Sequence, residues 1–433
     1  MNALADECNA VILNEAAPVL DMLSELGKKL YYPKGILSQS AEAKQKGDTF
    51  NATIGIATQN SEGMHLECVK KYFNELPVND IFTYAPSFGI PALRKRWKEK
   101  IIHDTPSLGD SCISTPVVTH ALTHGLSIAA DLFIQPGDLV ILPDKIWGNY
   151  KLILNVRKKA EFLHFPFFDG NRFNIEACSK TVREAAKKRK KLVMLLNFPN
   201  NPTGYSISVE EAEKLVDILL KAASGGTRIA ALLDDAYYGL FYEKDTLQES
   251  LFGKLAGLHE NILAVKLDGA TKEFYMWGFR TGFITFGIRS GTEALYDALE
   301  KKTAGGIRGN ISNCCKLSQN VLLRILDDPD LQKQKEEKFR VMKERALKVK
   351  EVLSNEKFES VWDAYPFNSG YFMCLRLKHA DPEKLRVHLL DKYGTGVIAV
   401  NSTDVRIAFS CLETDEIEEL FETVYTAAKE TEE

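Results

Sequence analysis

Several polar side chains that could carry out chemistry stand at the ends of short apolar runs. Asn201, Asp234, Tyr237 and Lys272 each follow such a run, and Arg406 opens another. A carboxylate and a phenol three residues apart can reach neighbouring atoms of one heterocycle. A lysine among small residues at a strand end is well placed as an amine that reaches into a cleft. An arginine in an apolar strand usually pairs with a carboxylate, and the sequence leaves open whether that carboxylate belongs to the protein or to a ligand.

These residues need a sheet that brings the ends of several strands together. From about residue 110 to 290, β-branched or Leu-rich runs alternate with helical patterns, which predicts a mostly parallel central sheet flanked by helices. Ligands bind at the carboxyl edge of such sheets. Ser208 with Glu211 forms a capping box, and Gly225 is a stop signal, so a helix is predicted between them. The candidate strands are 139–142, 161–165, 192–196, 229–233, 262–267 and 283–286.

The end of the chain has a different pattern. Residues 331–355 predict a long, partly exposed helix, and strand-like 371–377 and 405–412 follow within helical surroundings. This indicates a smaller α+β domain. We predict a large domain over 61–325 and a small domain built from 1–60 and 326–433. A short helical pattern at 19–26 is expected to pack on one of these two cores.

Composition excludes several classes of function. The 433 residues carry 55 Lys plus Arg and 59 Asp plus Glu, a formal net charge of −4. No basic block is present, so the sequence offers no footprint for nucleic acid or an anionic membrane surface. The longest apolar runs reach about five residues, far short of the ~20 that span a bilayer. No targeting segment is visible, the eight cysteines are dispersed, and we expect a cytoplasmic protein.

Two other motifs favour ordinary structural explanations. The segment 394–399, GTGVIA, matches a dinucleotide fingerprint only superficially, because it follows a helical pattern and precedes a strand. His120 and His124 have a spacing that could hold a metal on one helix face, but no third ligand is in reach, so no metal site is predicted. Taken singly, Asn201 also fits a plain Asn-Pro turn, and Asp234 fits a helix N-cap.

In their order and spacing, the motifs NFPNNPTG, LLDDAYYG, DGATKEFYMWGFRTG and VRIAFSCL resemble the pyridoxal-phosphate-dependent aminotransferases of fold type I, class I/II, of the aspartate/aromatic kind. The resemblance covers about residues 55–412. It implies that Lys272 bonds covalently to pyridoxal 5′-phosphate and that Asp234 pairs with the pyridine nitrogen. It also implies that Tyr237 and Asn201 donate to the phenolate oxygen of the ring. Trp147, in LPDKIWGNY, looks like the aromatic residue that stacks on the ring and borders the substrate.

The resemblance also implies how the phosphate is held. Arg280 matches the arginine that grips it, and Tyr84, in YAPSFG, matches a tyrosine that reaches the phosphate of the neighbouring subunit of a homodimer. This sequence departs from the family at two places. Ala121, Leu122 and Thr123 stand where Ser/Gly-type residues are usual, and Gly269 stands where many relatives have a hydroxyl residue. The remaining phosphate contacts are expected from Ala121, Leu122, Thr123 and Thr271, partly through backbone amides.

The substrate contacts implied by the resemblance involve both chain ends and the partner subunit. Arg406 is similar to the residue that clamps the substrate α-carboxylate, and Gly55, in ATIGIA, to the backbone contact beside it. Arg308 stands four residues before the pair Ser312 and Asn313, as in aspartate aminotransferases. There the arginine crosses the dimer interface to bind the side-chain carboxylate. Asn-Cys-Cys replaces the more usual Asn-Pro-Pro at this point.

The implied function is transfer of an amino group from aspartate, glutamate or an aromatic amino acid to a 2-oxo acid such as 2-oxoglutarate, by a ping-pong mechanism. Asp234 would keep the pyridine nitrogen protonated, and Lys272 would move the proton from Cα. Two alternatives stay open. One is a pyridoxal-phosphate-dependent carbon–sulfur lyase, and the other is a cofactor-binding regulator without catalysis, which would need a DNA-reading domain before Gly55.

Overall fold

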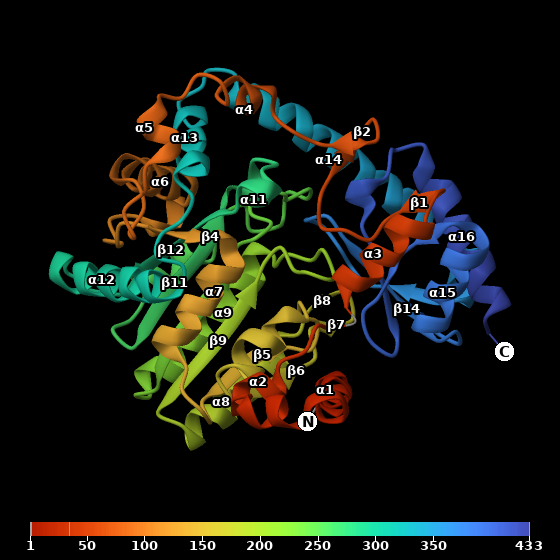
Figure 1. Cartoon of the computed structure of the whole chain (residues 1–433), viewed down its shortest axis with the longest axis horizontal. Coiled ribbons are helices and arrows are strands. Elements are labelled where there is room, and N and C mark those ends of the chain that lie inside the picture. Colours follow the sequence, from red (N-terminus) through yellow and green to blue (C-terminus); the bar gives the residue numbers. More distant parts are fainter. Residues whose placement is uncertain (1, 34, 433) are drawn as a thin grey trace.

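The computed structural model describes residues 2–33 and 35–432, and its largest element is a seven-stranded sheet (Figure 1). Six of its strands are parallel to one another, and β12 is antiparallel to both of its neighbours. All six predicted strands are present, so the predicted fold class is confirmed. In spatial order the strands are β4 (Val117–His120), β12 (Thr281–Gly287), β11 (Ile262–Gly269), β10 (Arg228–Asp234), β9 (Lys191–Asn197), β5 (Leu139–Pro143) and β6 (Glu161–Phe165).

Helices cover both faces of this sheet, which is why its strands are continuously apolar. In β9, Leu192, Met194 and Leu196 belong to one buried cluster, whereas Val193 and Leu195 belong to the cluster on the opposite face. The predicted capping box is present at the start of α9. The helices of this part are α6 (Pro91–Asp104), α7 (Ala121–Phe133), α8 (Ile175–Lys188), α9 (Val209–Ser224), α10 (Phe252–Ala256), α11 (Ala270–Glu273), α12 (Glu293–Asn310) and α13 (Lys316–Ile325).

A second, smaller sheet lies beside helices from the end of the chain. The long helix α14 (Leu331–Leu353) runs from the larger part to the smaller one (Figure 1). From near the start of the chain, α3 (Ile36–Lys46) joins this part, and β1 (Phe50–Asn51) pairs with β15 (Thr395–Gly396). The exact bounds of the two domains stay a prediction. The sheet order is β13 (Trp362–Ala364), β14 (Met373–Leu377), β17 (Asp404–Ile407) and β16 (Ile398–Ala399), with helices α15 (Pro382–Tyr393) and α16 (Glu416–Glu430).

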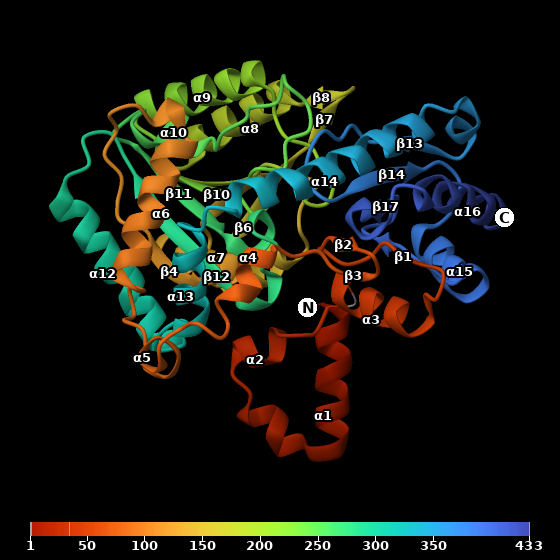
Figure 2. The same cartoon turned by 90° about the horizontal axis from the view of Figure 1, so that it is seen from above.

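The first helices do not pack on either core as expected. Helices α1 (Ala3–Met22) and α2 (Glu25–Lys29) lie against each other and project from the molecule (Figure 2). In α1 only Ala5 is buried, and Val19 in α1 and Leu26 in α2 are exposed at 45% and 37%. The expectation that the pattern at 19–26 joins a core is therefore wrong, because none of its residues is buried among the residues that the structure describes. Short elements complete the chain: β2 (Thr58–Gln59), β3 (Glu62–Gly63), α4 (Glu67–Lys71), α5 (Val78–Phe82), β7 (Phe168–Asp169) and β8 (Arg172–Phe173).

Across the described residues, the chain forms no helix with the length and apolar character needed to span a bilayer.

Candidate functional site

Several of the predicted site residues gather at the carboxyl edge of the large sheet. Asn197 at the end of β9 lies in register with Asp234 at the end of β10, and Asp234 in turn with Leu267 near the end of β11. Asn197 ties the edge together: its side chain donates to the backbone oxygen of Asp234 at 2.8 Å and accepts from the backbone NH of Asn201 at 2.8 Å. Parallel pairing therefore delivers Asn201, Asp234 and the start of α11 to one place.

Asp234 is a buried carboxylate with a defined set of partners. The hydroxyl of Tyr150 donates to its Oδ2 at 2.6 Å, and the backbone NH of Ala236 donates to its Oδ1 at 3.1 Å. Burial raises the pKa of Asp234, while the hydrogen bond from Tyr150 and the charge of Lys272 oppose that rise. Each carboxylate oxygen can accept a further bond. The arrangement suits a carboxylate that pairs with a protonated ring nitrogen.

Lys272 lies in α11, directly after β11. Its Nζ is 4.9 Å from the centre of the Tyr237 ring, and the Tyr371 hydroxyl lies 3.4 Å from its backbone oxygen. Burial lowers the pKa of Lys272, the charge of Asp234 opposes this, the charge of Arg280 adds to it, and together they set the pKa at about 8. An amine with this pKa is far more often neutral near physiological pH than an ordinary lysine, as a nucleophile or base requires.

An aromatic path joins Lys272 to Arg406. The ring of Tyr237 lies 5.5 Å from that of Phe372, and the guanidinium of Arg406 lies 4.0 Å from the centre of the Phe372 ring. Gly55 faces the same place, because a Cβ there would lie 3.4 Å from both the Tyr237 hydroxyl and Phe372. Burial raises the pKa of Tyr237, so its hydroxyl keeps its proton and can donate it.

Arg406 is fully buried on β17 of the smaller sheet, and its side chain contacts the loop that follows β9 of the large sheet. It donates to the side-chain oxygen of Asn201 at 3.0 Å and to the backbone oxygen of Thr53 at 2.6 Å. No carboxylate is among its partners in the described part of the chain, and its Nε is buried without a hydrogen-bond partner there. A buried guanidinium left in this state has capacity for a carboxylate ligand.

The loop that carries Trp147 is anchored to the strand that carries Arg406. Lys145 forms an ion pair with Asp404 at 2.6 Å, and both side chains are largely buried. Lys145 precedes Trp147 by two residues, and Asp404 precedes Arg406 by two. Trp147 itself is half-buried and packs edge-on against Tyr150 at 5.5 Å. This ion pair therefore links the two sheets at the site.

The expected phosphate contacts surround the start of α7. Ala121, the first residue of α7, has a φ of 60°, and Leu122 and Thr123 follow in the first turn, where backbone NH groups favour an anion. Among the described residues, the buried hydroxyl of Thr271 has no hydrogen-bond partner. Arg280 lies beside the site and is half-buried, and burial lowers its pKa. Arg280 also donates to the backbone oxygen of Trp277 at 3.1 Å, and its remaining donors, with the Thr271 hydroxyl and the amides of α7, fit a phosphate.

The departure at Gly269 has a steric reason. A Cβ at this position would come within 2.6 Å of the backbone oxygen of Thr281 and 2.7 Å of Gly282. Gly282 is equally restricted, because its own Cβ would lie 2.7 Å from the backbone of Ala121. Strands β11 and β12 and the start of α7 therefore pack backbone against backbone, and a hydroxyl residue has no room. The buried, unpartnered hydroxyl of Thr281 lies at this junction.

The two spaced histidines, His120 and His124, are joined by a hydrogen bond. His124 Nδ1 accepts from the backbone NH of His120 at 3.0 Å. Burial and the neighbouring His120 lower the pKa of His124 to about 4, so its imidazole is neutral at physiological pH. Over the described residues, no group of three or more potential metal ligands is found.

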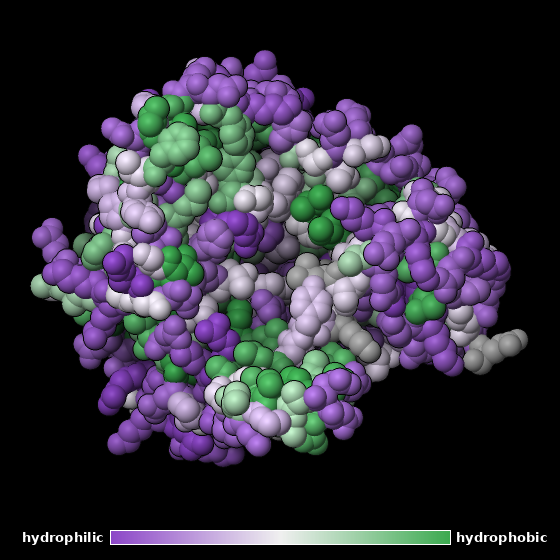
Figure 3. Space-filling model, in the orientation of Figure 1, coloured by the Kyte–Doolittle hydropathy of each residue, from purple (hydrophilic) through white to green (hydrophobic). Residues whose placement is uncertain are grey.

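Tyr84 and Arg308 lie on the surface, apart from the cluster. Tyr84 is 88% exposed, and Arg308, in the last turn of α12, donates to Ser312 Oγ at 2.7 Å. Their segments adjoin, because Ser87 Oγ donates to the backbone oxygen of Ser312 at 2.9 Å. Exposed apolar side chains precede Tyr84 in the chain, including Phe82 at 80%, and Figure 3 shows apolar residues gathered over α5 and α13.

Sequence reasoning missed four residues of the site. Tyr150 stands three residues after Trp147 in a segment that was recognised for its tryptophan alone, and Asn197 opens the recognised motif NFPNNPTG. Phe372 and Thr53 had no local signal, because each meets Arg406 only through the tertiary fold.

Comparisons with known proteins agree with this geometry. Residues 51–424 match the family model described as aminotransferase class I and II. The aspartate aminotransferase of Pyrococcus abyssi is 25% identical over 220 residues, which are 50% of this chain and 52% of that protein. The LL-diaminopimelate aminotransferase of Gloeobacter violaceus is 26% identical over 260 residues, 59% of this chain and 61% of that protein. These matches thus span about half to three fifths of each relative.

A solved structure extends the likeness to the whole fold. The crystal structure of an aminotransferase from Anaerococcus prevotii has a TM-score of 0.82, with 23% sequence identity, and covers 95% of this chain and 100% of that one. At this identity the likeness shows the fold alone, and that fold is the one described above.

Proposed function

The chain belongs to the class I and II aminotransferase family, and from that premise we propose that it is a pyridoxal-phosphate-dependent aminotransferase. The observation that carries the proposal is the position of Lys272. Its amine has a lowered pKa and lies against Tyr237 at the strand edge that holds Asp234, with Arg406 at the other end of the same aromatic path. This arrangement provides an amine, a buried carboxylate and a carboxylate-binding guanidinium in one site.

The residues present fit the cofactor. Lys272 would hold it covalently, Asp234 would pair with its ring nitrogen, Tyr237 and Asn201 would donate to its phenolate oxygen, and Trp147 would cover its ring. The unpartnered hydroxyl of Thr271 supports a phosphate at the start of α7, with Arg280 beside it and Ala121, Leu122 and Thr123 in the first turn. When bound, pyridoxal phosphate supplies the electron sink that stabilises negative charge on the substrate Cα.

The chain's own groups would then move the proton and hold the substrate. Lys272, neutral for an appreciable part of the time at its lowered pKa, would take the proton from Cα as general base. Tyr150 stabilises the ionised form of Asp234 by its 2.6 Å hydrogen bond. Arg406 would bind the α-carboxylate in two-point fashion beside Gly55, which fixes the orientation of the Cα–H bond.

We propose aspartate, glutamate or aromatic amino acids as donors and a 2-oxo acid such as 2-oxoglutarate as acceptor, which use the same pocket in turn. The dicarboxylate part depends on Arg308 entering from the partner subunit of a homodimer. Support comes from the surface on which Arg308 and Tyr84 lie together with exposed apolar side chains, as expected for residues that complete a neighbour's site.

A donor and acceptor screen on the purified protein tests this proposal. Aspartate is offered with 2-oxoglutarate, glutamate with oxaloacetate, and phenylalanine with either acceptor. The expected result is stoichiometric conversion of the donor to its 2-oxo acid and of the acceptor to its amino acid. Lys272→Ala serves as the inactive control. Release of pyruvate and ammonia from cystathionine without any acceptor would instead identify a carbon–sulfur lyase. Failure of every donor with a cofactor-loaded protein would refute the aminotransferase proposal.

A further inference from the structure

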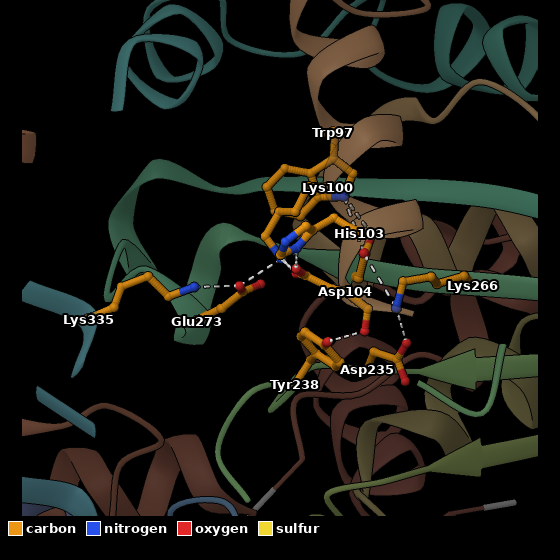
Figure 4. A network of polar contacts seen from close by, with 10 residues as sticks. Trp97, Lys100, His103, Asp104, Asp235, Tyr238, Lys266, Glu273 and Lys335 are labelled. Atoms are coloured by element: carbon orange, nitrogen blue, oxygen red, sulfur yellow. Dashed lines mark hydrogen bonds and ion pairs between the residues drawn. The ribbon is translucent and has the colours of Figure 1, made fainter. Parts of the chain in front are cut away.

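Each of three site residues is followed in the sequence by a member of one buried polar network. The network comprises Lys100, Asp104, Asp235, Tyr238, Lys266, Asp268, Glu273 and Lys335, with Trp97 at its edge (Figure 4). The site residues and their network neighbours are Asp234 and Asp235, Tyr237 and Tyr238, and Lys272 and Glu273. The site and the network thus share three peptide links.

At the lysine end, Glu273 is held from two sides. Its Oε1 accepts from Lys100 Nζ at 2.7 Å and from Lys335 Nζ at 2.7 Å. Lys100 belongs to α6 and also pairs with Asp104 at 2.6 Å, whereas Lys335 belongs to the first turns of α14. Figure 4 shows Lys335 approaching Glu273 from the opposite side to Lys100. The residue after Lys272 is thus tied to α6 and to the helix that leads to the smaller sheet.

At the aspartate end, the same pattern recurs. Asp235 accepts from Lys266 through a short ion pair and from Ser250 Oγ at 2.6 Å, and Lys266 also lies 3.6 Å from Asp268. The two ends meet at Tyr238, because its ring lies 5.3 Å from Lys100 Nζ and 5.1 Å from Lys266 Nζ.

The charges at the lysine end are fixed. Burial would by itself raise the pKa of Glu273, but the charges of Lys100 and Lys335 outweigh it and lower that pKa. Burial would likewise lower the pKa of Lys100, but Glu273 and Asp104 raise it. Because the groups stay ionised and buried together, each lysine offsets part of the cost of burying the Glu273 charge.

We infer that Glu273, gripped by Lys100 and Lys335, is a positioning residue that fixes α11 so that the Lys272 amine stays over Tyr237. This inference rests on the proposed aminotransferase function for its catalytic consequence, but its structural part concerns the amine alone. Because α11 has only four residues, a single helical turn with little stability of its own, its position depends on its tertiary contacts: its buried residues, the Tyr371 hydroxyl at the Lys272 backbone oxygen and the ion pairs of Glu273. Removing the ion pairs of Glu273 removes the contacts that hold its carboxyl end. The amine would then spend part of its time in solvent instead of in the site.

The two ion pairs of Glu273, with Lys100 and Lys335, form the grip, and Lys335 is the more exposed of the two lysines. Lys335→Met therefore tests the grip, and α14 provides a matched control. Lys335 is 24% exposed and Lys348 is 23% exposed, but Lys348 pairs with Glu351 and Glu418 near the far end of the helix. Lys348→Met therefore removes an equally exposed lysine and its ion pairs from the same helix without touching α11. Glu273→Gln is the second test variant, and it keeps the shape of the side chain while removing its charge.

The first readout is the pH midpoint for acetylation of Lys272 in the cofactor-free protein, measured by mass spectrometry. Charge alone would move this midpoint in opposite directions, up in Lys335→Met and down in Glu273→Gln. A loosened α11 moves it up in both, from about 8 towards the ordinary lysine value, because burial is what lowers it. A rise in both variants but not in Lys348→Met supports the inference, whereas opposite shifts or no shift overturn it.

The second readout uses the cofactor-loaded enzyme and an amino donor deuterated at Cα. Lys335→Met is expected to lower kcat at least fivefold and to increase the deuterium isotope effect, with KM changed less than twofold, while Lys335→Arg restores most of the rate. If kcat and the isotope effect of both Lys335→Met and Glu273→Gln lie within twofold of those of Lys348→Met, the inference is overturned. If the unmodified protein transaminates no donor, the proposed function fails, and the acetylation midpoints still decide whether Glu273 positions Lys272.

Discussion

The lowered pKa of Lys272 leads to a quantitative prediction about the cofactor-free protein. With a pKa of about 8, roughly one in eleven Lys272 side chains is neutral at pH 7, against roughly one in 3,000 for a lysine of pKa about 10.5. Only the neutral amine reacts with acetic anhydride. We therefore expect trace acetylation to label Lys272 up to about 300-fold faster at pH 7 than an equally accessible ordinary lysine, with a midpoint near pH 8.

Two neighbouring substitutions fix the sign of this effect. The negative charge of Asp234 raises the pKa of Lys272, so Asp234→Asn should move the labelling midpoint below that of the unmodified protein. The positive charge of Arg280 lowers that pKa, so Arg280→Gln should move the midpoint up. Lys100, whose pKa is raised by Glu273 and Asp104, should stay unlabelled at pH 7 in the same digest. A Lys272 midpoint near 10.5, or shifts of the opposite sign, would refute the electrostatic reasoning.

Three further variants test separate parts of the site. Arg308→Ala should lower kcat/KM for aspartate roughly 30- to 150-fold, the equivalent of about 2–3 kcal/mol for a charged contact. Phenylalanine turnover should stay nearly unchanged, and equal losses for both donors would contradict the dicarboxylate role. Lys145→Met leaves the buried charge of Asp404 without its cation, so it should cost about 3–5 kcal/mol in urea unfolding and raise KM for the amino donor. An unchanged KM would show that this ion pair does not orient the strand of Arg406. Gly269→Ser forces its Cβ against the backbone of Thr281 and should lower stability by about 1–3 kcal/mol in thermal unfolding, whereas an unshifted Tm would mean that the strands separate easily.

The large sheet could be predicted because its strands are buried on both faces. Runs such as Leu192 to Leu196 are apolar at every position, and this pattern survives without knowledge of any partner strand. The direction of β12 could not be predicted, because 283–286 is equally apolar whichever way the strand runs. The exposure of Val19 was also missed, since a helical apolar pattern does not say what surface meets it.

The site residues divide in the same way. Asp234, Tyr237 and Lys272 were predictable because each directly follows a recognisable strand, so local order places them at one edge. The pair of Lys145 with Asp404 spans 259 residues, and the sequence carries no signal that joins two ordinary charges at that distance. The grip on Glu273 by Lys335 is hidden for the same reason, although Glu273 itself adjoins the lysine that the motif identifies.

Hydride trapping tests the identity of the active amine most directly. The purified protein, loaded with pyridoxal phosphate until its visible absorption is constant, is reduced with borohydride, digested and mapped by mass spectrometry. One modified site is expected, with the reduced cofactor on Lys272 and no visible band left after reduction. A protein that stays colourless with the cofactor, or a cofactor mass carried by any other lysine, would contradict the proposal that Lys272 is the amine at the centre of this site.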